Sequence, residues 1–298
     1  MFIDIHAHAY RKRPPFIPFC NADEVLRRYD EVGIEKGALL PIVSPEIYIP
    51  QSNEDILEMA ANHPDRFIPF CNIDPRALTN SADAPLDRLL RHYKDLGCKG
   101  VGEVMPNLPM MHPLVQNLFR HAQDVGLPVI FDGSDQLTGD FGLQDDPGLP
   151  QLEHTLQRFP NLVLLGHGPL FWAEIGRLDT PAEGRFIFRP DGGQVGRHPS
   201  GPIKEEGVTP KLLRRYPNLY GDLSDPSPWH ALTRDPDYGP RFLMEFQDRL
   251  LFGTDIITPN SSFPIVDLLV EWRDTKKITE QAFMKIAREN AIRLLGLE

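Results

Sequence analysis

The chain has 298 residues, of which 41% are hydrophobic and 24% are charged, and its formal net charge is −11 at pH 7. This is the composition of a globular protein large enough to bury a full core. The negative charge argues against a surface for nucleic acid or for an anionic membrane, and no apolar stretch is long enough to cross a bilayer. We therefore expect a protein that acts on a small-molecule substrate and binds neither nucleic acid nor a membrane.

The three cysteines, Cys20, Cys71 and Cys98, are widely spaced and form no Cys-x-x-Cys pair. This pattern fits neither a disulfide framework nor a zinc knuckle, and it indicates a reducing compartment. The first apolar run begins at residue 2, which leaves no room for a signal peptide. We expect a cytoplasmic location, and we expect Cys71 and Cys98 to be small buried hydrophobic residues.

Eight short apolar segments follow one another along the chain, and most are preceded by a helical segment that stops at glycine or proline. Their lack of strict alternation predicts parallel strands that are buried on both faces. Eight strand-and-helix units in about 250 residues is the count of a TIM barrel. The predicted strands are residues 2–8, 37–43, 67–73, 100–105, 128–132, 162–167, 219–223 and 250–255, and the predicted helices are residues 22–32, 86–96, 112–125, 149–159 and 278–295.

We therefore predict an α/β fold, a (β/α)8 TIM barrel, in which residues 1–298 form a single domain. A doubly wound open sheet is the competing arrangement, but it predicts a glycine-rich turn after strand one, where this chain has His6-Ala7-His8. The longest connection, residues 169–218 after strand six, is predicted to be an active-site loop, with surface decoration as the alternative.

Two histidines one residue apart, His6 and His8, close the first predicted strand. Residues i and i+2 of a strand point to the same face, so the two imidazoles are predicted to project side by side as metal ligands. Two unrelated histidines in a surface loop are the alternative. Asp4 has the same parity and lies deeper in the barrel, where it either orients a metal ligand or makes a structural hydrogen bond.

Ionisable side chains also fall at the carboxyl ends of the other strands, where barrel active sites are built. Such groups are costly at the end of a buried strand unless they are paired or bound to a metal. Six strands that converge on one mouth are poorly explained by isolated structural hydrogen bonds. Besides the histidine pair, these residues are Glu103 on strand four, Asp132 on strand five, His167 on strand six, Asp222 and Ser224 on strand seven, and Asp255 on strand eight.

Four segments resemble the amidohydrolase superfamily, specifically the amidohydrolase-2 group that includes aminocarboxymuconate-semialdehyde decarboxylase, related aromatic-acid decarboxylases and lactone hydrolases. Their order and spacing cover essentially the whole chain. They are Asp4-Ile5-His6-Ala7-His8, residues 165–168 (Leu-Gly-His-Gly), residues 251–255 (Leu-Phe-Gly-Thr-Asp) and the terminal residues 289–297.

The resemblance implies that His6, His8 and Asp255 hold one divalent metal, Zn2+ first and Mn2+ as the alternative. In the decarboxylases of this group strand five ends in a histidine ligand, and the corresponding position here is Asp132. Three interpretations stay open. Asp132 ligates the metal in place of that histidine, or Glu103 completes the set of ligands instead, or the metal site is weakened or lost.

The same resemblance implies the chemical roles. A bound Zn2+ lowers the pKa of its water from near 16 to roughly 7, Asp255 would accept the proton of that water, and His167 would polarise the substrate carbonyl or stabilise the oxyanion. Asp222, His230 and Arg13 are predicted to contact substrate. For Asp222 a normal strand-to-turn transition is an equal alternative, and for Arg13 the alternative is an exposed basic loop.

Three functions follow from this sequence. The first is a metal-dependent hydrolase of a small lactone, ester or amide, which uses metal-activated water and an aspartate as general base. The second is a metal-dependent decarboxylase, a lyase of a small carboxylated substrate, and the missing strand-five histidine places it second. The third is a catalytically silent barrel that binds a ligand. A homodimer is the default expectation for a soluble enzyme of this kind.

Overall fold

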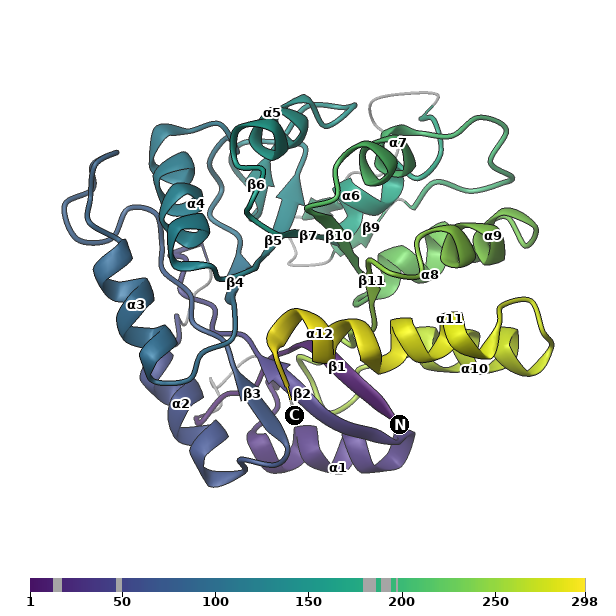
Figure 1. The fold of residues 1–298 in the computed structure, drawn as a ribbon, viewed down its shortest axis with the longest axis horizontal. Helices are drawn as coiled ribbons and strands as arrows, with labels where there is room; N and C mark the ends of the chain where they lie inside the picture. The colour runs from purple at the N-terminus through teal and green to yellow at the C-terminus, as the bar shows by residue number, and fades with distance from the viewer. Residues whose placement is uncertain (13–17, 47–49, 179–185, 189–193, 197, 298) are drawn as a thin grey trace.

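A computed structural model describes residues 1–12, 18–46, 50–178, 186–188, 194–196 and 198–297 of the chain (Figure 1). Eight of its strands correspond to the eight predicted ones, and all their pairings are parallel. These strands are β1 (Phe2–Ala7), β2 (Ile34–Leu39), β3 (Phe67–Pro69), β4 (Val101–Val104), β5 (Val129–Ser134), β7 (Leu164–His167), β10 (Leu219–Asp222) and β11 (Leu250–Leu251).

The strands pair in the chain order that a barrel requires. One sheet has the order β1-β2-β3, and a second runs β4-β5-β7-β10-β11. Backbone contacts join the two sheets at both seams. At one seam Cys71, just beyond β3, pairs with Val101 of β4, and at the other Ala7 of β1 pairs with Ile256, just beyond β11. At the second seam the Ile5 N–H also donates to the carbonyl of Phe252, over 2.9 Å. The predicted α/β TIM barrel is confirmed.

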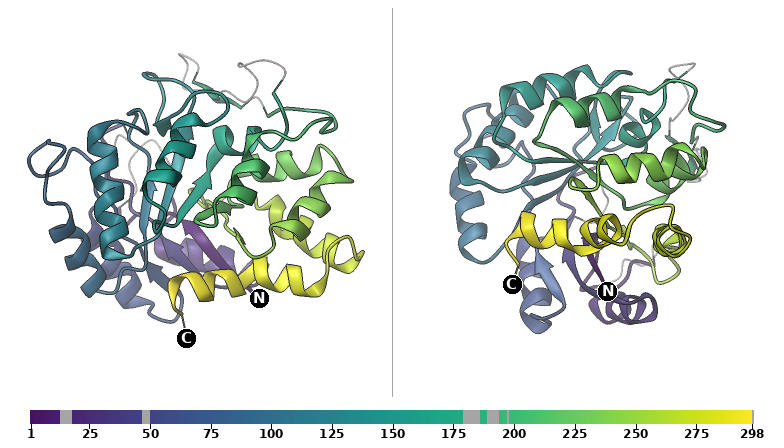
Figure 2. Two further views of the ribbon diagram at one scale, coloured as in Figure 1. Left: turned by 45° about the horizontal axis from the view of Figure 1, so that its top comes forward. Right: turned by 45° about the vertical axis from the view of Figure 1, so that its right-hand side comes forward.

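The helices lie outside the strands (Figures 1 and 2). The sequence marks their ends: α1 begins with a capping box between Asn21 and Glu24, and it stops at Gly33 in the left-handed conformation. The helices are α1 (Ala22–Val32), α2 (Asn53–Asn62), α3 (Asp87–Asp95), α4 (Pro113–Val125), α5 (Pro150–Arg158), α6 (Gly168–Ala173), α7 (Val208–Arg215), α8 (Pro226–Thr233), α9 (Tyr238–Glu245) and α10 (Pro264–Asp274).

The C-terminal helix predicted over residues 278–295 is interrupted. It consists of α11 (Glu280–Met284), a π-helical turn (Lys285–Glu289) and α12 (Asn290–Leu295), and the views agree that it runs beside β1 (Figures 1 and 2). A π-helical turn changes which carbonyls are used within a helix. Here the carbonyl of Ile286 accepts from the Phe252 N–H, and the Asn290 amide donates to the carbonyl of Leu250. The segment thus supplies one side-chain donor and one backbone acceptor to the backbone at the end of β11.

The long connection after β7 contains more regular structure than the predicted loop. Helix α6 starts directly at the end of β7, an antiparallel pair forms between β8 (Phe186–Phe188) and β9 (Gln194–Gly196), and α7 leads into β10. Residues 179–185, 189–193 and 197 of this connection lie outside the described part of the chain. A further short strand, β6 (Leu143–Gln144), pairs with the end of β5.

The core has two layers, as a barrel wrapped by helices requires. One cluster fills the inside of the barrel, and a larger one lies between strands and helices. Cys71 and Cys98 belong to the outer cluster and are buried and free, as predicted. The inner cluster contains Ile3, Ile5, Ala38, Leu40, Ile68, Phe70, Ile130, Leu165 and Leu251, with Ala291 and Leu295 of α12.

Asp4 ties three parts of the barrel together below the histidine pair. Its Oδ1 accepts from the backbone N–H groups of His6 and Thr254, each over 2.9 Å. Its Oδ2 accepts from the Tyr29 hydroxyl at 2.7 Å and from Thr254 Oγ1 at 2.6 Å. Of the two predicted roles the structure shows the hydrogen bonds of a barrel-floor group, and these fix the backbone next to His6 and next to Asp255.

Replacement of Asp4 by Asn should therefore destabilise the protein. An amide oxygen cannot accept from all four donors, so the buried Thr254 and Tyr29 donors lose partners, at a cost of roughly 2–4 kcal/mol in the free energy of unfolding. Urea unfolding of the variant checks this, with Asp124→Asn on the exposed face of α4 as control.

The same substitution carries a pH signature. Burial raises the pKa of Asp4 from 3.8 to about 6, against the lowering effect of its hydrogen bonds. The folded state then holds the Asp4 proton more tightly, so the stability this group contributes is full below pH 3.8 and is lost as pH rises through about 6. We expect a larger deficit at about pH 4 than at about pH 7; an equal deficit at both would contradict this linkage.

Candidate metal centre

The two histidines of β1 are held in fixed orientations at the centre of the barrel. His6 and His8 are 0% and 1% exposed, and their Nε2 atoms lie 3.0 Å apart. Each Nδ1 faces an acceptor, because His6 Nδ1 is 2.7 Å from Asp222 Oδ2 and His8 Nδ1 is 2.9 Å from the carbonyl of Leu40. Each Nδ1 therefore carries the proton, and both Nε2 atoms turn toward the same point.

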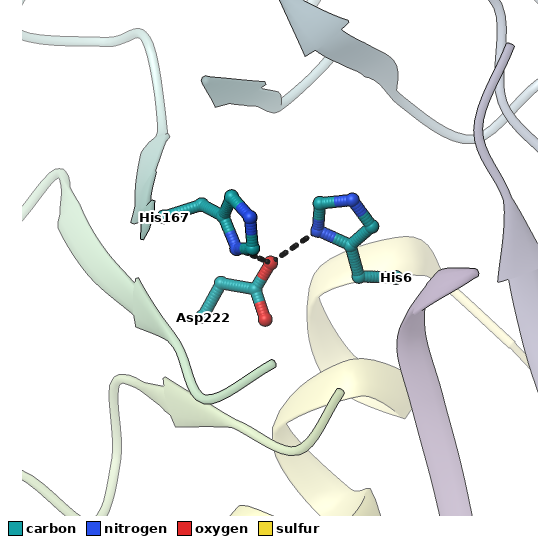
Figure 3. Close-up of side chains that lie close together, drawn as sticks. All are labelled: His6, His167 and Asp222. Atoms are coloured by element: carbon teal, nitrogen blue, oxygen red, sulfur yellow. Dashed lines mark hydrogen bonds and ion pairs between the residues drawn. The ribbon is translucent and has the colours of Figure 1, made fainter. Parts of the chain in front are cut away.

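Asp222 serves two imidazoles from opposite sides of the barrel (Figure 3). Its Oδ2 lies 2.7 Å from His6 Nδ1 and 3.3 Å from His167 Nδ1, and its Oδ1 accepts from the Ser224 N–H. The Ser224 hydroxyl lies 2.9 Å from His167 Nδ1. Asp222 is 0% exposed and its oxygens are occupied, so the structure does not support the prediction that it contacts substrate. It holds His6 and His167 in orientation.

Two carboxylates complete a cluster around the histidine pair. Glu103 Oε2 lies 3.4 Å from each of the two Nε2 atoms, and Asp255 Oδ1 lies 3.7 Å from His6 Nε2 and 3.3 Å from His8 Nε2. Asp255 Oδ1 is buried and has no hydrogen-bond partner in the described part of the chain. Four potential ligand atoms thus lie around the histidine pair.

The distances from the histidine pair to each carboxylate fit ligands of one metal ion, and His6, His8 and Glu103 together form a group of potential ligands. Ligands at 2.0–2.2 Å from such an ion lie roughly 3.3–3.6 Å from one another. The atom pairs given above are separated by 3.0 to 3.7 Å. The donor set of two neutral imidazoles and two carboxylates suits Zn2+ or Mn2+.

Asp132 and His167 lie on the far side of Glu103. His167 Nε2 is 3.7 Å from Glu103 Oε1, and Asp132 is the partner of His167 in the β5–β7 register. Potential ligand atoms of Glu103, Asp132 and His167 all lie within 4.8 Å of one another. Glu103 is therefore the carboxylate that the structure brings to the histidine pair, whereas Asp132 faces His167.

The electrostatics of the cluster follow from burial and mutual charge. Burial lowers the pKa of His6, but Asp222 and Glu103 outweigh it and raise that pKa well above its ordinary value. His6 in turn holds the pKa of Glu103 well below its usual range despite burial. Burial and the charge on Glu103 raise the pKa of Asp132. Desolvation and the nearby His6 lower the pKa of His167, but Asp222 and Glu103 outweigh them and raise it to about 10.

A cavity of about 410 Å³ opens beside the cluster at the carboxyl ends of the strands. Its polar lining includes Asp140 and Asp225, which the sequence analysis did not single out. Asp225 lies three residues after the end of β10 and could have been found by that rule, whereas Asp140 lies between β5 and β6, where no pattern marks it. The lining residues are Phe19, Ile42, Glu103, Met105, Asp132, Gly133, Asp140, Phe141, His167, Pro169, Asp225, Pro226, Asp255 and Ile257.

Of the other two predicted substrate contacts, the structure describes only His230. His230 stacks on His198, with ring centroids 4.1 Å apart, and does not line the cavity. Arg13 lies outside the described residues. Arg11, close to it in sequence, pairs with Glu58 over 2.6 Å.

Within the described residues, none of the helices has the length and apolar character needed to span a bilayer. A comparison with curated proteins found no match to the chain. A search of solved structures found several barrels that cover nearly its whole length. An uncharacterised TIM-barrel protein from Bordetella bronchiseptica has a TM-score of 0.61 and 19% identity, with 99% of this chain and 98% of that chain covered.

Several of the similar structures carry an enzyme name, and two of them represent the two reactions. A probable 2-pyrone-4,6-dicarboxylic acid hydrolase from Acinetobacter baumannii has a TM-score of 0.59 and 14% identity, with 99% of both chains covered. The 5-carboxyvanillate decarboxylase from Sphingomonas paucimobilis has a TM-score of 0.61 and 15% identity, with 100% of this chain and 99% of that chain covered. At these identities the likeness shows the fold alone.

The family model for amidohydrolases matches residues 3–297, which is nearly the whole chain. Members of this family are enzymes, hydrolases and decarboxylases among them, and they are typically metal-dependent. The match spans every strand and every ligand candidate described above. The protein belongs to the amidohydrolase family, in its amidohydrolase-2 group.

Proposed function

We propose that this protein is a metal-dependent hydrolase that cleaves a small lactone, ester or amide. The observation that carries the proposal is the convergence of His6 Nε2, His8 Nε2, Glu103 Oε2 and Asp255 Oδ1, at separations of 3.0 to 3.7 Å, at the edge of a cavity. Such a set of inward-facing acceptor atoms is costly to bury unless a cation is shared among them.

In this proposal His6, His8, Glu103 and Asp255 hold the metal, Zn2+ first and Mn2+ as the alternative. When bound, the metal supplies a Lewis acid and a water acidified to near neutral pH. The remaining parts of the mechanism belong to the chain. Asp222 and the Leu40 carbonyl keep the proton on each Nδ1, so that both Nε2 atoms stay free to coordinate.

Asp255 is the proton acceptor. It lines the cavity, its side chain is 18% exposed, and its Oδ1 has no hydrogen-bond partner among the described residues. If Oδ1 is the atom that holds the metal, the second oxygen of the same carboxylate can take a proton from the attacking water and pass it to the leaving group.

His167 stabilises the negative charge that develops on the substrate oxygen. Asp222 and Ser224 fix its Nδ1, which leaves Nε2 directed at Glu103 and the cavity it lines. As a cation at neutral pH, His167 can donate a charge-assisted hydrogen bond from Nε2 to that oxygen.

Decarboxylation is the second candidate, because the same protonated His167 could deliver a proton to the carbon that loses CO2. Two of the similar structures, of a pyrone dicarboxylate hydrolase and of a carboxyvanillate decarboxylase, carry the two reactions on this fold. Hydrolysis is placed first because Asp255, with its free oxygen, suits the activation of water.

The metal is tested by elemental analysis of protein purified without chelator or affinity metal. We expect close to one zinc or manganese per chain, and none in the His6→Ala/His8→Ala double variant. A wild-type protein that stays metal-free after reconstitution would contradict the proposal and favour a barrel that only binds a ligand.

The two carboxylates separated by the structure should behave differently. Glu103→Gln should lose the metal, because Glu103 Oε2 lies 3.4 Å from both histidines, while Asp132→Asn should keep it. Asp222→Asn should weaken metal binding by roughly 10- to 100-fold, because it releases the orientation of His6. Metal dissociation constants of the three variants check this; loss of metal from Asp132→Asn alone would assign the shell to strand five.

Asp255→Asn should reduce kcat by at least about a thousandfold, since it removes the proton acceptor and weakens one metal ligand. Its thermal unfolding should stay near that of the wild type, because Asp255 Oδ1 makes no hydrogen bond in the described structure. Turnover of an active ester or lactone measures the effect, with Asp124→Asn as a charge-matched control. Wild-type turnover in Asp255→Asn would mean that the base lies elsewhere.

A further inference from the structure

Asp132 presents one open carboxylate oxygen to the cavity. The residue is 5% exposed, lies at the end of β5 and lines the cavity. Its Oδ1 accepts from the Gly133 N–H at 2.8 Å. Its Oδ2 has no hydrogen-bond partner within the part of the chain that the structure describes. This oxygen is therefore the part of the Asp132 side chain that is available to water or to a ligand in the cavity.

The backbone next to β7 is shaped around this carboxylate. Gly168 begins α6 with a φ of +79°, and a Cβ at this position would lie 1.9 Å from Asp132 Oδ1. Glycine is therefore needed both for the backbone conformation and for the close approach of the carboxylate. With Oδ1 fixed by Gly133 and enclosed by Gly168, the remaining oxygen is the one that a ligand in the cavity can reach.

Asp132 is accompanied by two further cavity carboxylates. Asp140 accepts from the Ser134 hydroxyl, and Asp225 accepts from the N–H and the hydroxyl of Ser227. Their donors are neutral, burial raises the pKa of both groups, that of Asp225 to about 7, and His167 is the positive group that acts on Asp132 and Asp225. A metal held by Glu103 and Asp255 would compensate those two acids, but it leaves Asp132 and its two companions facing the rest of the cavity.

The rest of the cavity lining is apolar. Phe19, Phe141, Ile42, Met105 and Ile257 supply aromatic and aliphatic surface in the same cavity. A cavity of about 410 Å³ with apolar surface and fixed carboxylates suits a small ligand that has an apolar body and a positive end.

We propose that this cavity selects substrates that carry a protonated amine, which docks against the open oxygen of Asp132 while the apolar body packs on Phe19 and Phe141. The inference rests on the proposed function, because it assigns Glu103 and Asp255 to the metal, and it names the substrate class of that site. A carboxylate-bearing substrate of the same size is disfavoured, since its charge repeats the sign of the cavity acids.

The experiment measures equilibrium binding of three probes of one size to the metal-loaded protein at neutral pH: benzylammonium, benzyl alcohol and benzoate. Calorimetry should give a Kd for benzylammonium at least about tenfold lower than for benzyl alcohol, since hydrogen bonds to charged groups are worth about 1.5–3 kcal/mol. Benzoate should bind more weakly than benzyl alcohol. This order in the wild-type protein decides the inference without any variant.

Asp132→Asn should remove the preference for benzylammonium and leave the Kd of benzyl alcohol unchanged. Asp124→Asn also removes one negative charge, but on the exposed face of α4, and should keep the preference. Equal or tighter binding of benzyl alcohol or benzoate, or no binding of benzylammonium by the wild-type protein, overturns the inference. So does a second metal ion per chain that Asp132→Asn loses, which would give the open oxygen to a metal.

The two proposals fail separately. Binding of the probes is measured without turnover, and the metal content of the same samples reports on the proposed function. One metal per chain without a preference for benzylammonium overturns the substrate class alone. A preference for benzylammonium in a protein that never takes up metal overturns the metal-dependent hydrolase alone.

Discussion

The arrangement of the site depends on one buried oxygen, Asp222 Oδ2, which lies close to the Nδ1 atoms of both His6 and His167. A carboxylate in this position fixes the tautomer of each ring, because it can only accept. Both Nε2 atoms are then directed to opposite oxygens of Glu103, one toward the histidine pair and one toward the cavity. Asp222 on β10 thus orients one imidazole toward the histidine pair and the other toward the cavity.

The barrel gives this interaction its precision by bringing residues distant in sequence to one ring of strand ends. His6 and Asp222 are 216 positions apart and reach hydrogen-bonding distance because β1 and β10 are both parallel strands of the same barrel. Asp4 adds a second constraint below the ring, where its hydrogen bonds to the His6 and Thr254 N–H groups lock the backbone that presents His6 and Asp255. Fixed backbone at both ligands keeps the acceptor atoms together despite their repulsion.

The sequence predicted what depends on local pattern and chain order. All eight strands correspond to predicted segments because a buried parallel strand is a continuous apolar run, and the polar residues at their ends were found by the same rule. Helices α2, α6, α7, α8, α9 and α10 were not predicted. Of these, α6 and α8 span eight residues or fewer and begin beside a proline that is equally typical of a turn. The π-helical turn in the C-terminal segment has no pattern of its own.

The sequence could not show how deep each side chain lies at the carboxyl ends of the strands, or which neighbour it faces. Asp222 was predicted to contact substrate, but strand parity fixes only that a side chain points inward, and its partners draw it beneath the histidines. The choice between Glu103 and Asp132 had the same origin, because neighbouring strands end at one rim and only the three-dimensional path decides which carboxylate faces the histidine pair. Asp132 is the register partner of His167, and Glu103 is the carboxylate beside the histidine pair.

The charge of the cavity bears on the choice between the two reactions. Hydrolysis and decarboxylation can use the same metal ligands and the same protonated His167, so the cluster alone does not separate them. Decarboxylation requires a substrate carboxylate to enter a cavity whose own carboxylates, at Asp132, Asp140 and Asp225, repeat its sign. Hydrolysis of a neutral bond in an amine-bearing substrate places positive charge against those groups instead. Under the proposed substrate class, the acids that are not needed to hold the metal would favour the hydrolytic reaction.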